Sequence, residues 1–94
     1  MKFMVTWRVH DEQRHEVLQY FGGQTAEDQA AELGGVNLIG RWHEPVSLTG
    51  VAICESDDPA AVANWLLNWN HVCDIEVTPV FDDDETRAIA RARG

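Results

Sequence analysis

Two arginines and two threonines are the residues of this chain whose types and spacing most directly suggest a binding site. Arg8 and Arg41 are predicted to project from one face of a β-sheet, together with the hydroxyl side chains of Thr6 and Thr78. A guanidinium group binds carboxylates and phosphates through paired hydrogen bonds, so this arrangement predicts a site for a small anionic molecule. The alternative is that the arginines form structural ion pairs, for example with Glu76, within a dimer.

His43 is the candidate for proton transfer if the protein is an enzyme. A histidine titrates near neutral pH and can act as a general base when a carboxylate orients its ring. Glu44 follows it in the sequence, but neighbouring residues of a strand point to opposite faces of the sheet. The alternative is a hydrogen-bonded histidine at a surface or interface. His10 and His15 lack the i, i+4 spacing of a helical metal-binding pair, and no metal or cofactor is predicted.

The size and charge of the chain limit the classes of function. Its 94 residues are 45% apolar and carry a formal net charge of −9, which predicts one small globular domain. An acidic surface repels nucleic acid and anionic membranes, so neither is an expected partner. No stretch approaches the roughly 20 apolar residues of a membrane helix, and the N-terminal residues do not resemble a secretory signal. A cytoplasmic protein with two reduced, apolar cysteines is therefore expected.

Hydrophobic periodicity predicts four strands and two helices. The strands are expected at Lys2 to His10, Val36 to His43, Thr49 to Glu55 and Asp74 to Phe81, and the helices at Asp11 to Phe21 and Pro59 to Asn70. The order strand, helix, strand, strand, helix, strand is that of the α+β ferredoxin-like sandwich, a four-stranded antiparallel sheet with strand order 4-1-3-2. Both helices would cover one face of this sheet and leave the other face open.

The alternation of side chains along a strand assigns residues to the two faces of the sheet. In the first strand, the helix-covered face would hold Phe3, Val5, Trp7 and Val9. In the second strand it would hold Val36, Leu38 and Trp42, with Ile39, Arg41 and His43 on the open face. The third strand would offer to the open face only the small residues Gly50, Ala52 and Cys54. The open face is thus expected to form a shallow trough, although a one-residue slip in the second strand would exchange its two sets.

Two segments lie outside this pattern. Residues 24–33 stand between two glycine pairs and predict a short helical excursion, either on the surface or as a lid over a pocket. Residues 83–94 begin with acids and end with arginines, which matches the dipole of a helix. We expect a marginal helix there, beyond a single domain at residues 1–82.

Several motifs resemble those of the DUF3303 family. They are the opening MKFMVTW, GRWH at residues 40–43, WLLNWN at 65–70 and EVTPV at 76–80. The resemblance implies small bacterial proteins of uncharacterised function with the architecture of dimeric α/β barrels, in which two open sheets face each other. That wider class includes cofactor-independent monooxygenases, haem-degrading enzymes and proteins without known catalysis. The chain departs from the family pattern in the longer segment 24–33 and in His71, where an acid is expected.

The sequence thus predicts a homodimer that binds a small anionic molecule on the open sheet face. Arg8 and Arg41 would hold the anion, Thr6 and Thr78 would donate hydrogen bonds, and His43 would line the entrance. The first alternative is a non-catalytic assembly or regulatory module whose open face is used up in dimerisation, with the arginines paired to Glu76 or Asp74. The second is an oxygenase-like enzyme, which would require an enclosed apolar cavity beside His43 and a tryptophan.

Overall fold

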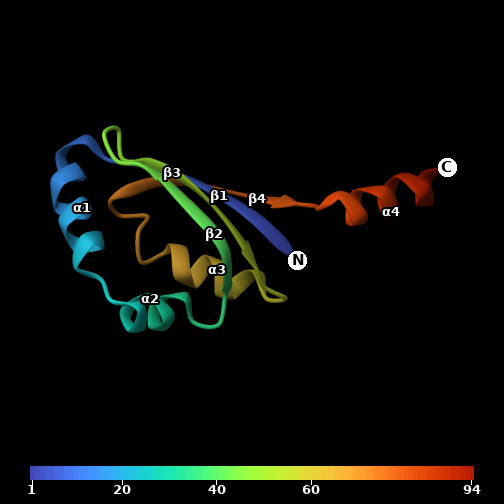
Figure 1. The fold of residues 1–94 in the computed structure, drawn as a ribbon, viewed down its shortest axis with the longest axis horizontal. Helices are drawn as coiled ribbons and strands as arrows, with labels where there is room; N and C mark the ends of the chain where they lie inside the picture. Colours follow the sequence, from blue (N-terminus) through green and yellow to red (C-terminus); the bar gives the residue numbers. More distant parts are fainter.

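A four-stranded antiparallel sheet forms the centre of the computed structural model, which describes residues 1–94 (Figure 1). Its strands are β1 (Lys2–Val9), β2 (Asn37–Glu44), β3 (Thr49–Glu55) and β4 (Cys73–Val80). They lie in the order β2-β3-β1-β4, which is the predicted order read from the other edge. All three pairings are antiparallel, so the predicted ferredoxin-like fold class is confirmed.

Three helices lie on one side of this sheet (Figure 1). They are α1 (Arg14–Gly23), which follows the 3₁₀ turn η1 (Asp11–Gln13), α2 (Ala26–Leu33) and α3 (Pro59–Leu66). Helix α3 ends at Leu66, four residues before the predicted end, and turns follow it. The segment between the glycine pairs is the helix α2, because Thr25 and Asp28 form a capping box at its start. No helix of the structure has the length and apolarity to span a bilayer.

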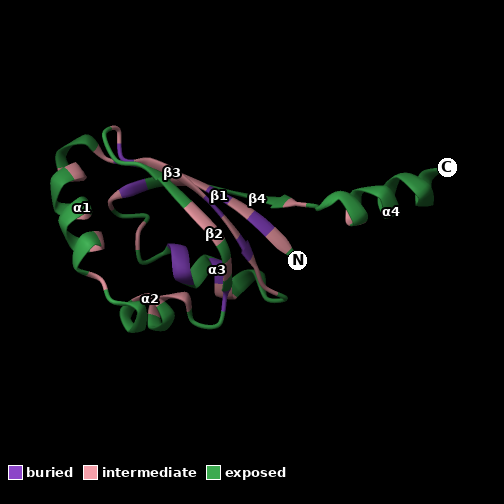
Figure 2. Ribbon diagram, in the orientation of Figure 1, coloured by how far each residue is buried: buried purple, intermediate pink, exposed green.

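The core lies between the central strands and α3. Val5, Ala52 and Cys54 are almost completely inaccessible, and Trp65 of α3 packs against the same cluster. Figure 2 shows buried positions in the strands of the sheet and on α3. Both cysteines are free and buried, and burial raises the pKa of the Cys73 thiol to about 11. They are therefore protonated, apolar core residues at neutral pH.

The face assigned to β3 from the sequence is wrong. Gly50, Ala52 and Cys54 lie opposite core residues of β1, with Trp7 paired to Gly50. Residues directly opposite in an antiparallel pair share a face, so the small residues point towards the helices. The reason is space, because a Cβ on Gly50 would lie 2.2 Å from Cζ2 of Trp7. The open face consequently carries larger β3 side chains and is not the predicted trough.

The faces assigned to the second half of β2 are also wrong, because the strand contains a bulge. The register shifts between Leu38 and Gly40, so Ile39 has no partner on β3. One extra residue exchanges the two faces of everything that follows it. Arg41 is therefore opposite Ala52, on the helix-covered face. Trp42 is on the open face, where its side chain is 61% exposed.

The C-terminal segment forms the helix α4 (Asp83–Arg93), which extends away from the sheet and the other helices (Figures 1 and 2). Asp82 and Glu85 form a capping box at its start. The amino group of Lys2 connects this start to the sheet, because its Nζ lies 3.4 Å from Asp82 and 3.2 Å from Glu85. The helix predicted for this segment is present, and none of its residues is buried.

Candidate functional site

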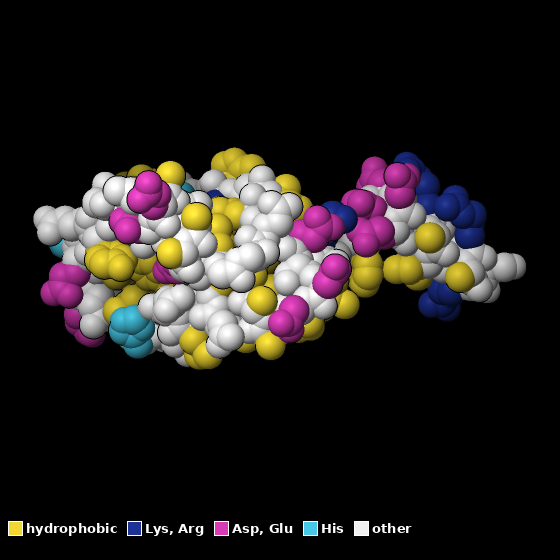
Figure 3. All heavy atoms as spheres, turned by 90° about the horizontal axis from the view of Figure 1, so that it is seen from below, with side chains coloured by type: hydrophobic (Ala, Val, Ile, Leu, Met, Phe, Trp, Pro, Cys, Tyr) yellow, Lys and Arg dark blue, Asp and Glu magenta, His cyan; other side chains and the backbone are white.

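An apolar cavity of about 330 Å³ lies between the sheet and helices α1 and α3. Its size is within the range of small-molecule sites. Helix α1 reaches the sheet through Phe21 but buries none of its residues, so the space beside it is not filled. From the helix side, hydrophobic side chains are visible at the surface between acidic ones (Figure 3). Its lining includes Trp7, Val17, Phe21, Arg41, His43, Trp65 and Trp69.

Arg41 is the only lining residue with a fixed charge. Its Nη2 donates a hydrogen bond to Oε1 of Gln29, 2.8 Å away on α2, and its guanidinium carbon lies 4.8 Å from the centre of the Phe21 ring. Burial lowers the pKa of Arg41, and the negative charge of Glu32 opposes this effect. A guanidinium still keeps its proton at neutral pH. Because its hydrogen-bond partner is a neutral amide, Arg41 has donors and charge available for an anion.

His43 stands beside Arg41 and packs between two aromatic rings. The centre of its imidazole ring lies 5.5 Å from the ring centre of Trp7 and 4.8 Å from that of Phe21. Burial, and then the positive charge of Arg41, lower the pKa of His43 below 6.5. The imidazole is therefore neutral at pH 7. Glu44 does not orient it, because this carboxylate accepts hydrogen bonds from Val46 and Ser47 in the following turn.

The cavity is apolar and lies beside His43 and Trp7, but it is partly open to solvent and not enclosed as an oxygenase-like enzyme would require. The cavity also lacks the orienting carboxylate of a general base, since the side chain of Glu44 is bound to the following turn. A catalytic role of His43 therefore stays a prediction.

The sheet divides the five predicted site residues between its two faces. Arg41 and His43 line the cavity on the helix side. The other three, Thr6, Arg8 and Thr78, lie on the open face: Thr6 is paired with Glu76, Arg8 with Asp74, and Thr78 with Met4. The prediction of one open-face site formed by all five residues is therefore wrong.

Several lining residues were predicted only as core, and the sequence carries no sign of their second role. Trp65 and Trp69 belong to the apolar stripe of the second predicted helix, and Phe21 belongs to that of the first. They border a cavity because α1 buries none of its residues and does not fill the space between itself and the sheet. The distance between a helix and a sheet is not encoded in the apolar periodicity of either.

The lowered pKa of His43 predicts a pH-dependent stability. Because the fold disfavours the charged imidazole, the stability that His43 contributes is fully present above about pH 6.5 and is lost progressively as the pH falls through the lower pKa of the folded state. We expect the urea midpoint to fall more between pH 7.5 and 5.5 in the native protein than in a His43→Gln variant. Equal decreases in the two proteins would show that His43 is as easily protonated in the fold as in the unfolded chain.

The fold and the cavity define a small α+β ferredoxin-like domain with one apolar site beside a charged strand residue. The chain belongs to DUF3303, a domain family of unknown function, whose model matches residues 1–94. No curated protein matches the sequence.

Solved structures of three proteins are similar in fold. SCO4226 from Streptomyces coelicolor A3(2) has 23% identity and a TM-score of 0.49, with 85% of this chain and 95% of that chain covered. A NIPSNAP family protein from Agrobacterium tumefaciens has 14% identity and a TM-score of 0.49, with 88% and 96% covered. An uncharacterised NIPSNAP domain protein from Burkholderia xenovorans has 14% identity and a TM-score of 0.46, with 87% and 95% covered. At these identities and TM-scores the likeness carries no statement about function.

Proposed function

We propose that this protein binds a small, largely apolar molecule with one acidic group in the cavity between the sheet and helices α1 and α3. The observation that carries the proposal is the position of Arg41, the one fixed charge among apolar walls. The apolar part of the molecule would pack against the aromatic side chains of Trp7, Trp65 and Trp69, and its acidic group would reach Arg41. The neutral His43 beside it can add one hydrogen bond.

The net charge of the protein supports an anionic ligand at this point. The chain carries −9 overall, so its outer surface does not attract anions. A cation that is half-buried in an apolar cavity would offer an anion a stronger interaction than an exposed side chain does. Arg8, on the open face, lacks this setting because it is exposed and opposite Asp74.

The experiment compares carboxylic acids with their neutral counterparts. Isothermal titration calorimetry would measure binding of a panel of short aliphatic and aromatic monocarboxylates, each beside the corresponding alcohol. The native protein should prefer the acid, and Arg41→Met should weaken acid binding roughly 10- to 100-fold, because a hydrogen bond to a charged group contributes about 1.5–3 kcal/mol.

The matched control for this experiment is Arg8→Met, which removes the same charge from the other face of the sheet. It should leave the preference for the acid unchanged. Absence of binding for the whole panel, or equal losses in the two variants, would contradict the proposal.

A second candidate is an assembly function, in which a second copy of the chain covers part of the open sheet face. The observation that favours it is Trp42, whose indole is 61% exposed on that face beside Gly40. Large exposed aromatic side chains on an uncovered sheet are typical of interfaces. Native mass spectrometry should show a homodimer at micromolar concentration, and a monomer across the accessible concentration range would contradict this candidate.

A further inference from the structure

Helix α4 gives the single chain an extended shape. The radius of gyration is 15.1 Å, whereas a compact domain of this length has about 12 Å. The accessible surface is 6392 Å², about 900 Å² more than the roughly 5,500 Å² of a compact monomer of this mass. That excess is close to the roughly 800 Å² that one partner buries in a standard protein interface.

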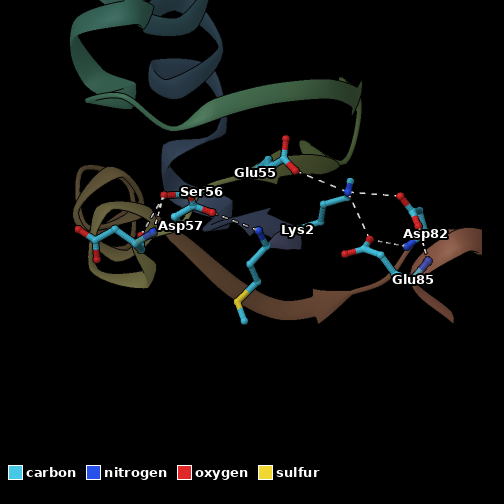
Figure 4. A network of polar contacts seen from close by, with 8 residues as sticks. Lys2, Glu55, Ser56, Asp57, Asp82 and Glu85 are labelled. Atoms are coloured by element: carbon cyan, nitrogen blue, oxygen red, sulfur yellow. Dashed lines mark hydrogen bonds and ion pairs between the residues drawn. The ribbon is translucent and has the colours of Figure 1, made fainter. Parts of the chain in front are cut away.

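The start of α4 is fixed to the body, so the helix has a defined direction. Lys2 contacts three carboxylates, on Glu55, Asp82 and Glu85, at 3.5, 3.4 and 3.2 Å (Figure 4). The capping box at Asp82 satisfies the backbone N–H groups of Asp82 and Glu85. Helix α4 consequently continues in the direction of β4 (Figure 1).

Apart from the contacts of Glu85 with Lys2 and of Arg87 with Asp83 and Asp84, the side chains of α4 have no partner within their own chain. Ile89 is 46% exposed and Phe81, just before the helix, is 56% exposed. Ile89 shares its side of the helix with Arg93, four residues later. An isolated helix of 11 residues is marginal in water, so its stability calls for packing against another surface.

The distribution of charge along the chain indicates which surface α4 can pack against. Residues 83–94 hold three acids and three arginines, which leaves four basic and thirteen acidic residues, a net −9, in residues 1–82. Within α4 the acids lie in the first turn, and the last turn holds Arg91 and Arg93. Figure 3 shows this separation, with the basic end farthest from the body. The free end of the helix is thus complementary to the acidic body of a second copy.

Strand β4 is the part of that body that matches α4 in length and charge. It is an edge strand, and Asp74 near its start is exposed on the open face, where its Oδ1 lies 3.1 Å from Nε2 of His10 and the residue is opposite Arg8. From Phe81 back to Asp74 the strand spans about 24 Å, and from Phe81 forward to Arg93 the chain spans about 22 Å. A two-fold axis near Phe81 would therefore bring Arg93 of each copy beside Asp74 of the other copy.

We infer that α4 is an arm that docks along strand β4 of a second copy of this chain, with Arg93 paired to Asp74 of that copy. This inference rests on the proposed homodimer and names the element that forms it. The two arms cross reciprocally, the two Phe81 side chains meet near the axis, and Ile89 packs against the partner's edge strand.

The experiment measures the dimer dissociation constant by analytical ultracentrifugation for the native chain and for charge-reversed variants. Arg93→Glu and Asp74→Arg should each weaken the dimer at least tenfold, because each breaks two symmetric contacts. The double variant Arg93→Glu/Asp74→Arg should restore the dimer, since the pair is re-formed with opposite signs. Combining Arg93→Glu with Glu27→Arg, an equal charge change on α2, should not restore it.

Deletion of residues 83–94 and the variant Trp42→Lys separate the possible outcomes. The deletion should give a folded monomer, since α4 contributes no buried residue, and near-ultraviolet circular dichroism would check the fold. A native chain that is monomeric contradicts the homodimer itself. A dimer that survives the deletion, or that only Trp42→Lys disrupts, overturns the arm and leaves the homodimer standing.

Discussion

Replacing Trp65 by alanine should lower the free energy of unfolding by about 3–5 kcal/mol, the range for large-to-small changes of buried aromatic residues. Trp65 is 4% exposed and joins α3 to the core of β1 and β3. A domain of this size has a total stability of about 5–14 kcal/mol. The variant should therefore unfold at a much lower urea concentration, measured by far-ultraviolet circular dichroism.

The control is Leu67→Ala, two residues further along, where the side chain is 59% exposed. A surface change of this kind should cost within about 0.5 kcal/mol. Trp65→Phe gives a second comparison. The buried Nε1 of Trp65 has no hydrogen-bond partner, so this change removes volume but no hydrogen bond. A similar loss in Trp65→Ala and Leu67→Ala would show that α3 is not packed onto the sheet as the structure has it.

The regular parts of the fold could be predicted because each obeys a simple period. The alternation of Phe3, Val5 and Val9 in β1 correctly places these residues in the core. The acidic N-cap and the proline of Asp58-Pro59 correctly locate the start of α3. Both signals are local, and each depends on the backbone geometry of one element.

The bulge in β2 could not be predicted, because it depends on pairing between strands. The alternation of side chains from Leu38 to His43 does not decide which set faces the helices. Only the register with β3 shows that Ile39 is left without a partner. The same register decides that Gly50 receives the Trp7 ring. One unpaired residue therefore moved Arg41 and His43 from the predicted open-face site to the cavity.

The largest expected effect on binding comes from filling the cavity. Val17 of α1 lines it and is not fully buried, so Val17→Trp would place an indole ring within the space of about 330 Å³ without breaking into the core of the sheet. Since α1 buries none of its residues, the fold should keep most of its stability. We expect the acid with the highest affinity in the calorimetric panel to bind at least roughly 100-fold more weakly, a loss of about 2.7 kcal/mol.

The matched control is Val46→Trp, which adds the same side chain at a turn position that is 84% exposed and outside the cavity. It should leave the affinity unchanged. Comparing Val17→Trp with Arg41→Met also separates the effect of cavity volume from the effect of charge on binding, because Val17→Trp keeps Arg41 and its hydrogen bond to Gln29. If Val17→Trp binds acids as tightly as the native protein, the apolar part of the ligand does not enter the cavity. Any loss in Arg41→Met would then come from an anion held at the surface.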